Sequence, residues 1–225
     1  MATEHAVLAV TGLKREARIL TGDGVCVIIG GGDQAQLAAS LARAAAGAIG
    51  IISIGLAGAL QAGLRPGDWV VARAVVDGEA RTFTDPDWTV RLADLLPNPR
   101  LGEVSGSDLM IAEVAAKSAL YATTRALAVD MESHIAARVA TAHGLPFAVA
   151  RVISDGADHA LPPAAQRGMR PDGGMDVMAV LASLAGDPRQ LPALIRTALA
   201  AETAFRALVR GRQLLGPALG GPDLG

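Results

Sequence analysis

Short apolar runs alternate with an amphipathic segment along the first third of the chain. Residues 5–11, 25–29 and 49–54 are apolar runs of strand length, and residues 69–76 read as a further strand. Between the second and third runs, residues 34–46 place apolar side chains at helical spacing. Strands that alternate with helices are typical of a mainly parallel sheet with helices on both faces.

A strand–helix–strand unit follows in the second half of the chain, with an acid at each junction. Residues 126–129 form a short β-type run that ends before Glu132, and residues 147–153 form an apolar run that ends before Asp155. The helical pattern between them ends at Gly144. We expect both acids at the carboxyl ends of neighbouring buried strands, because ligands bind α/β sheets at that edge. Each acid alone would also suit an ordinary helix N-cap.

These patterns predict an α/β fold, with a single-domain three-layer αβα architecture and a mainly parallel or mixed central sheet. Residues 69–76 either extend this sheet or curl it toward a barrel. Residues 1–225 show no internal repeat or low-complexity linker, so we expect one domain, with residues 187–215 as a C-terminal helical segment. Residues 44–64 are uncharged, but five glycines divide them, which favours a buried strand and a tight loop over a membrane span.

Composition excludes several classes of function. The formal net charge of −2 provides no electrostatic footprint for nucleic acid. The single cysteine, Cys26, lies in an apolar run and suits a small buried side chain. The sequence contains neither the ligand spacing of a metal site nor the G-x-S-x-G motif of acyl chemistry, so we expect no metal and no cofactor. The N-terminus lacks a secretory leader, which predicts a cytoplasmic protein.

The two acidic junctions carry a resemblance. The segment V-D-M-E, followed later by R-V-I-S-D-G-A-D, resembles the paired signature of the purine nucleoside phosphorylase and methylthioadenosine nucleosidase superfamily. The resemblance implies a nucleoside phosphorylase-like fold and an enzyme that cleaves N-glycosidic bonds. It also implies that Glu132, with Met131 beside it, holds the ribose hydroxyls, and that Asp155 protonates the purine at N7.

Three further segments are similar to the same superfamily and occur in the same order. Residues 10–16, V-T-G-L-K-R-E, match the first-strand loop, whose glutamate, here Glu16, activates water in the nucleosidases. Residues 53–71 are similar to its T-G-S-A-G-G-L…L-x-x-G-D-V-V segment, and residues 104–108 resemble its V-S-G-D loop. The remaining site residues that the resemblance implies are these: for phosphate, Gly12, Arg15, Ser53 and Gly55; for the base, Leu109, Met110 and Ser154.

The chain departs from these patterns at two places. Ser53 and Leu56 stand where bacterial hexameric phosphorylases place an Arg and a Ser around phosphate, so part of the usual phosphate grip is missing. Lys14, Arg15 and Arg18 bring positive charge to the first loop, where they suit either a phosphate site or a solvated helix face. At the base, Leu109 and Met110 replace the Phe and Ile of the nucleosidases, so aliphatic contact replaces aromatic stacking.

The C-terminal half narrows the resemblance. Residues 153–165, I-S-D-G-A-D-H-A-L-P-P-A-A, precede R-P-D-G at residues 170–173 and P-R-Q-L-P-A-L-I-R at residues 188–196. This combination resembles the hopanoid-associated phosphorylase subfamily. The resemblance implies release of adenine from adenosylhopane, with phosphate as co-substrate, during hopanoid biosynthesis.

Three hypotheses follow. The first is a phosphorylase, a pentosyltransferase, acting on a purine nucleoside attached to a lipid. The second is a hydrolytic methylthioadenosine or adenosylhomocysteine nucleosidase, and the third is a non-catalytic nucleoside-binding protein, against which the retention of both Glu132 and Asp155 argues. We also expect a homo-oligomer.

The C-terminal segment has two interpretations. An apolar stripe at helical spacing, punctuated by arginines, suits a terminal helix that packs on the sheet. Alternatively, Arg206, Arg210 and Arg212 bring the protein to an anionic membrane surface, where a lipid-linked substrate resides. The second interpretation places the protein at the periphery of the inner membrane face.

Overall fold

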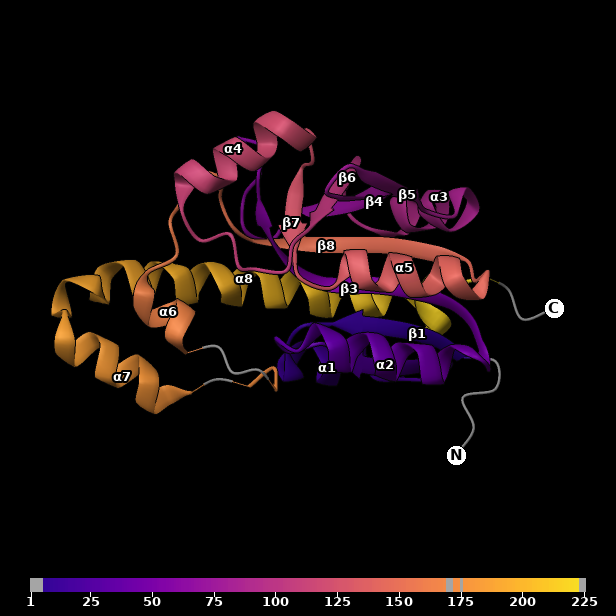
Figure 1. Ribbon diagram of the computed structural model, residues 1–225, viewed down its shortest axis with the longest axis horizontal. Helices are drawn as coiled ribbons and strands as arrows, with labels where there is room; N and C mark the ends of the chain where they lie inside the picture. Colours follow the sequence, from indigo (N-terminus) through magenta and orange to yellow (C-terminus); the bar gives the residue numbers. More distant parts are fainter. Residues whose placement is uncertain (1–5, 169–171, 175, 223–225) are drawn as a thin grey trace.

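The computed structural model describes residues 6–168, 172–174 and 176–222, and within them eight strands form one mixed sheet (Figure 1). The strands are β1 (Ala6–Thr11), β2 (Val25–Ile29), β3 (Ala48–Ala59), β4 (Trp69–Asp77), β5 (Ala80–Phe83), β6 (Arg100–Gly106), β7 (Ala128–Asp130) and β8 (Phe147–Asp155). Parallel pairing joins β2 to β1, β1 to β3 and β3 to β8. These pairs confirm the predicted mainly parallel core of a mixed sheet.

Part of the sheet closes on itself. β3 pairs with β8, β8 with β4, β4 with β6, β6 with β7, and β7 again with β3. The closure depends on the length of β3, whose first half pairs with β1 and whose last residues pair with β7. The sheet therefore does curl into a small barrel, with β1, β2 and β5 outside the ring.

Helices cover both faces of the sheet, as expected for three layers (Figure 1). On one face, α2 (Gln34–Ala45) and α5 (Ser133–His143) bury a core of Leu, Ile, Val and Ala side chains. On the other face, α1 (Lys14–Leu20), α3 (Pro86–Leu95) and the second half of α8 (Leu191–Leu215) bury a core that includes Trp69 and Trp88. The remaining helices are α4 (Val114–Thr124), α6 (Pro163–Arg167), α7 (Val177–Gly186), η1 (Pro188–Gln190) and η2 (Pro217–Gly220).

Two predictions about local structure are wrong. The third strand does not end at residue 54, because β3 continues through residues 55–58 to Ala59. Nor are the strands before Glu132 and Asp155 neighbours, since β3 lies between β7 and β8 and pairs with both. Gly58 of β3 is opposite Val129 on one side and Asp155 on the other. Tertiary pairing of the glycine-rich strand thus brings the two acidic junctions to its two sides.

The C-terminal helix has two different halves. In its second half, Ala204, Phe205, Leu208 and Leu215 are buried against the sheet, whereas Leu191, Ile195 and Leu199 of the first half are 48–66% exposed. In Figure 1 this first half projects beyond the sheet together with α6 and α7. Within the described ranges, no helix combines the length and apolar character needed to cross a membrane. Arg170 and Pro171 of the R-P-D-G segment lie outside the described residues.

Candidate active site

One buried arginine organises the carboxylates at the end of β7. Arg151, on β8, is fully buried, and its Nε forms an ion pair of 2.9 Å with Asp130 Oδ2. Its Nη2 lies 3.4 Å from Glu132 Oε2. Asp130 also accepts hydrogen bonds from the backbone N–H groups of Glu132, at 2.9 Å, and of Ser133, at 2.7 Å. The turn into α5 is therefore held by Asp130, and the Glu132 side chain lies against Gly12 and Gly30, which follow β1 and β2.

Ser53 belongs to the same group. Its hydroxyl accepts a hydrogen bond from Arg151 Nη2 and another, at 3.0 Å, from the Ser133 hydroxyl. Ser53 is completely buried. Its hydroxyl is hydrogen-bonded to Arg151 and does not face an open phosphate site. We call Ser53, Asp130, Glu132, Ser133 and Arg151 the arginine cluster.

Glu16 lies against this cluster from the first helix. Its side chain is 2% exposed and accepts hydrogen bonds from the Thr11 hydroxyl and, at 2.7 Å each, from the N–H groups of Leu13 and Leu56. Gly55 makes this approach possible, because a Cβ there would lie 2.7 Å from Glu16 Oε1. The sequence-predicted Gly12 is similar, since a Cβ there would lie 2.7 Å from Glu132 Oε1. Both glycines thus make room for carboxylates.

Carboxylates outnumber cations in this region. The pKa of Glu132 is raised from 4.5 to about 8, mainly by burial; Arg151 lowers it, while the charges of Asp130 and Glu16 contribute to the rise. One guanidinium is shared between Asp130 and Glu132, with the Glu16 carboxylate nearby. A pKa raised to about 8 favours the protonated form of Glu132 at neutral pH.

The other predicted catalytic acid has a partner of its own. Asp155 Oδ2 lies 2.5 Å from Nζ of Lys117, a fully buried residue of α4. Asp155 Oδ1 accepts a hydrogen bond of 2.7 Å from the hydroxyl of Ser154, which is half-buried. On the sheet side Asp155 lies against Gly58, where a Cβ would be 3.1 Å from Oδ2. We call Lys117 and Asp155 the lysine pair.

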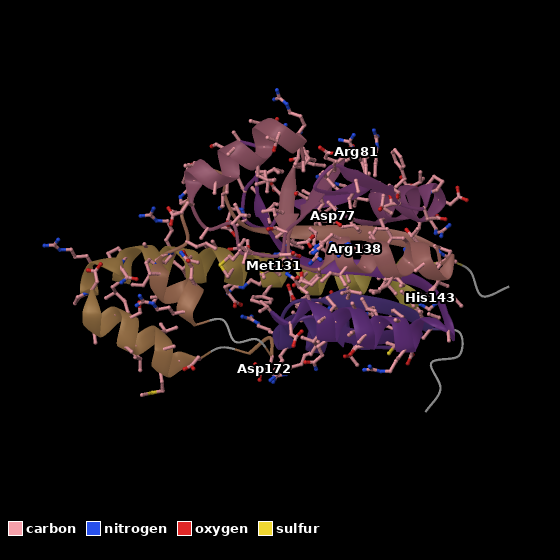
Figure 2. All side chains as sticks on the ribbon, in the orientation of Figure 1. Asp77, Arg81, Met131, Arg138, His143 and Asp172 are labelled. Carbon is pink, nitrogen blue, oxygen red and sulfur yellow. The ribbon has the colours of Figure 1, made fainter. Side chains whose placement is uncertain are left out.

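The other sequence-predicted residues lie at different distances from these groups. Met131 is half-buried and lines a small hollow with Gly30–Gly32 beside Glu132 (labelled in Figure 2). Arg15 lies outside the arginine cluster, because its guanidinium pairs with Glu202 at 2.7 Å and stacks 4.0 Å from the Phe205 ring centroid. Leu109 is 74% exposed and Met110 is half-buried, so neither predicted base contact lies in the protein interior.

The later R-P-D-G segment returns to the first loop. Gly173 O accepts a hydrogen bond of 3.0 Å from Lys14 N, and Asp172 pairs with Lys14 Nζ at 2.7 Å. Figure 2 shows Asp172 at the α1 end of the molecule. The described part of this segment therefore covers the loop that positions Glu16.

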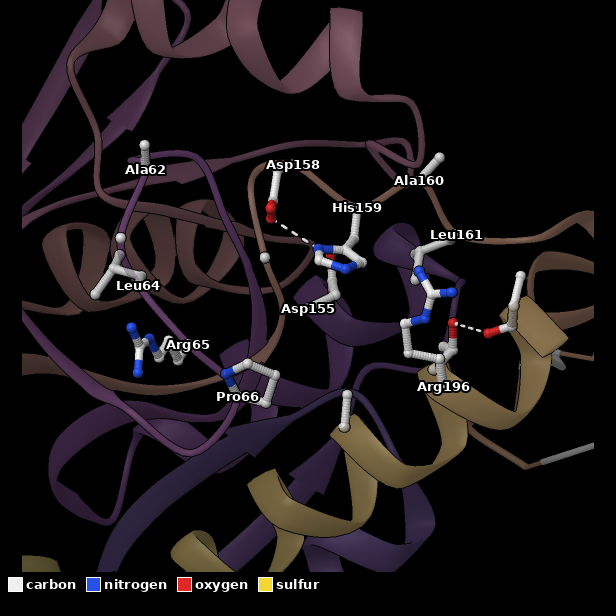
Figure 3. A pocket seen from close by; sticks show the side chains of 15 residues that line it. Ala62, Leu64, Arg65, Pro66, Asp155, Asp158, His159, Ala160, Leu161 and Arg196 are labelled. Atoms are coloured by element: carbon white, nitrogen blue, oxygen red, sulfur yellow. Dashed lines mark hydrogen bonds and ion pairs between the residues drawn. The ribbon is translucent and has the colours of Figure 1, made fainter.

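A cavity of about 470 Å³ lies between the lysine pair and the first half of α8 (Figure 3). Its lining includes Asp155, Gly156 and His159 on one side and Arg196 and Thr197 of α8 on another. Figure 3 shows Asp155 behind His159, whose ring Nδ1 lies 2.7 Å from Asp158 Oδ1. Among the described residues, no group of three or more His, Cys, Asp or Glu side chains is arranged to hold a metal ion.

Sequence reasoning did not identify Lys117 as a functional residue and assigned Arg151 no role. A signal existed for both. Lys117 is the one basic residue in an otherwise uncharged helical run over residues 114–124, and Arg151 is the one charge in β8 before Asp155. A lone charge in an apolar element has to find a buried partner, but the sequence does not say which one.

Comparison with protein-family models identifies the family of the chain. The model described as the phosphorylase superfamily matches residues 2–191. This chain belongs to the phosphorylase superfamily. This match confirms the resemblance that the V-D-M-E and I-S-D segments carry. The matched residues include both the strand that ends at Asp155 and the loop that carries Glu16. No curated protein matches the sequence significantly.

Solved structures support the superfamily fold. A 5′-methylthioadenosine/S-adenosylhomocysteine nucleosidase from Helicobacter pylori, bound to butyl-thio-DADMe-Immucillin-A, superposes with a TM-score of 0.64 at 17% identity, covering 91% of this chain and 96% of that one. The corresponding nucleosidase from Streptococcus pneumoniae, with a transition-state inhibitor, gives 0.61 at 20% identity, over 80% and 98%. At these identities the likeness shows the fold alone.

Proposed function

We propose that this protein releases adenine from adenosylhopane by cleaving its N-glycosidic bond, with phosphate as the acceptor of the ribosyl group. The observation that carries the proposal is the placement of three carboxylates at the ends of the neighbouring strands β1 and β3. Glu16 lies against Gly55, and Asp155 lies against Gly58, both on β3. Three residues of strand span about 10 Å, which is the scale of a nucleoside. Glu132 lies against Gly12, which follows β1.

The chemistry of the leaving group assigns Asp155. A purine departs as an anion unless it gains a proton, so a general acid at N7 lowers the barrier to cleavage. Asp155 is 8% exposed and borders a cavity, so it is accessible but held in one orientation by Lys117 and Ser154.

The chemistry of the sugar assigns Glu132. As the bond breaks, the ribose gains positive charge, which a nearby carboxylate stabilises. The same carboxylate accepts hydrogen bonds from the 2′ and 3′ hydroxyls, and hydrogen bonds to a charged acceptor are about twice as strong as neutral ones. Met131 supplies an apolar contact beside it.

The proposal of phosphate as acceptor is supported by the C-terminal segments described under Sequence analysis and by Lys14. Lys14 follows the Gly12 loop, and its ammonium forms a surface ion pair with Asp172, at side-chain exposures of 46% and 45%. Exposed ion pairs contribute about 0–1 kcal/mol, so exchanging Asp172 for a phosphate costs little. Lys14→Gln should therefore raise the KM for phosphate and leave the KM for the nucleoside nearly unchanged.

A second candidate is hydrolysis, with Glu16 as the base that activates water. The observation in its favour is the charge balance, since Arg151, the cation of the arginine cluster, is already committed to Asp130 and Glu132. A phosphate dianion beside these carboxylates needs additional positive charge, whereas water needs none. Glu16→Gln separates the two reactions, because a hydrolase loses its base and a phosphorylase receives a nucleophile that is already anionic.

The direct test offers adenosylhopane and methylthioadenosine to the wild-type protein, each with and without phosphate, and measures adenine and sugar phosphate. Phosphorolysis of adenosylhopane requires phosphate and yields a sugar phosphate. Full turnover without phosphate would replace this proposal with the hydrolytic one. Binding of both nucleosides without adenine release would indicate a nucleoside-binding protein.

A lipid-linked substrate resides in a membrane, so the protein needs a surface that contacts the membrane. In the C-terminal helix, Arg212 donates hydrogen bonds to Leu20 O at 3.1 Å and Gly216 O at 2.7 Å, so its side chain has a structural role. Arg189 and Arg196 lie instead on η1 and on the exposed first half of α8. We propose weak, salt-sensitive contact with anionic membranes through this half, which liposome flotation of the double variant Arg189→Gln/Arg196→Gln measures. Equal flotation of the variant and the wild type at low salt would contradict it.

A further inference from the structure

Lys117 is buried in a way that packing alone does not explain. All residues of α4 are described, and Lys117 is the one that is buried, while its neighbours in the helix are half-buried or exposed. Burying an ammonium costs several kcal/mol before its partners compensate. A leucine or methionine would fill the same place without that cost. The ammonium is therefore expected to have a task that depends on its charge or its protons.

The three donors of the ammonium all point to one short segment. Nζ donates to Asp155 Oδ2 at 2.5 Å, to Gly156 O at 2.9 Å and to His159 O at 2.9 Å. Each N–H group therefore has one acceptor, and the segment that follows β8 is tied to α4. Together with the Ser154 hydroxyl on Oδ1, these bonds leave the Asp155 carboxylate one orientation.

We propose that Lys117 is the positioning residue of Asp155 and the source of the proton that Asp155 delivers to the departing base. The inference rests on the proposed function, in which Asp155 is the general acid. Nζ of Lys117 and Oδ2 of Asp155 are in direct hydrogen-bond contact at 2.5 Å. A proton can therefore pass from the lysine through the carboxyl group of Asp155 to N7 of the base.

The step balances with the groups present. As the C1′–N9 bond breaks, its electron pair stays on the purine, and an oxygen of the phosphate acceptor forms the new bond to C1′. An Nζ–H bond of Lys117 breaks and an N7–H bond forms, with the Asp155 carboxyl group carrying the proton between them. The purine leaves neutral, and Lys117 remains as an amine that has two N–H donors in place of three. After the products leave, water in the 470 Å³ cavity returns a proton through Asp155, which lines that cavity.

The geometry also distinguishes Lys117 from a simple tether. A lysine transfers a proton, whereas an arginine keeps its charge and is not deprotonated in proteins. Lys117→Arg therefore retains a cation beside Asp155 and removes the proton source, while Lys117→Met removes both. The exposed next residue of the helix offers a matched control, Ser118→Met.

The experiment compares two leaving groups in the wild type, Lys117→Met, Lys117→Arg, Asp155→Asn and the double variant Lys117→Met/Asp155→Asn. The first substrate is an adenine nucleoside, whose base needs a proton. The second is a 4-nitrophenyl riboside, whose phenolate leaves without one. With adenine as leaving group we expect both Lys117 variants to lose about 10²-fold or more in kcat, as for the loss of a positioned general acid. With 4-nitrophenolate they should stay close to the wild type, as should Ser118→Met on both substrates.

The double variant tests whether Lys117 acts through Asp155. If it does, the double variant should turn over the adenine nucleoside no more slowly than Asp155→Asn. The reason is that the effects of substituting two residues of one coupled pair do not add. The double variant removes both charges together and leaves no unpaired buried charge. It can therefore still be compared with Asp155→Asn if Lys117→Met fails to fold.

Three outcomes would overturn the proposal. They are equal losses on both substrates, which mark a structural role; wild-type turnover in Lys117→Arg; and multiplicative losses in the double variant. A wild-type protein that releases adenine from no nucleoside would instead reject the proposed function itself, and with it the basis of this inference.

Discussion

The two ends of the site solve the problem of buried acids differently. In the arginine cluster, one guanidinium serves Asp130 and Glu132, with Glu16 close by. In the lysine pair, one ammonium serves one carboxylate. The first arrangement has an excess of negative charge, and the second is balanced.

The ratio of carboxylates to cations around each acid differs between the two ends, and this ratio affects how readily each acid holds or transfers a proton. Burial and excess negative charge raise the pKa of Glu132, so donors or positive charge brought close by a substrate would favour its charged form. A balanced pair keeps a proton available on the cation next to a carboxylate of fixed orientation. Substitutions that change one of the two arrangements at a time test this difference.

The largest effect is expected on the balanced side. Asp155→Asn keeps the size of the side chain and removes the proton carrier, so turnover of an adenine nucleoside should fall about 10²–10⁴-fold. Steady-state adenine release measures the loss, and circular dichroism checks the fold. Near-full activity on adenine nucleosides would remove Asp155 from the mechanism.

A smaller effect is expected from Glu132→Gln. A charged acceptor of the ribose hydroxyls becomes a neutral one, which should lower kcat/KM for a ribonucleoside by about tenfold. The matching 2′-deoxynucleoside lacks one of these hydroxyls and should lose less. If the variant and the wild type discriminated the two sugars equally, the ribose assignment of Glu132 would be wrong.

The smallest effect is a change of stability with pH. In the folded protein burial raises the pKa of Glu132 to about 8, from its ordinary value of 4.5, so between these values the folded state holds a proton that the unfolded state releases. This group therefore stabilises the fold below about pH 4.5 and loses that contribution as the pH rises to about 8. Glu132→Gln has no such titration.

We therefore expect the Tm of Glu132→Gln, relative to the wild type, to rise between pH 5 and pH 9. Thermal unfolding of both proteins without ligand measures this difference. A constant difference across the range would show that the charge excess of the arginine cluster is neutralised by some other group.

The sequence alone determined much of this protein, because some signals are local. Apolar runs with turn residues at their ends located β1, β2, β4 and most of β8, and the covered strands implied helices on both faces. The acids Glu16, Glu132 and Asp155 were readable as motif residues, since each stands at the end of a recognisable element. Superfamily membership followed from the order of those motifs and is confirmed by the family model.

Only the tertiary structure decided the partners of those acids. The apolar run of the third strand ends at residue 54, but pairing with β7 and β8 extends β3 through residues 55–58 and brings both acidic junctions to its sides. Lys117 and Asp155 are far apart in the chain, and their contact depends on where α4 lies. A buried charge requires a counter-charge, but local sequence does not specify which distant element provides it, because that choice is made by the packing of the whole fold.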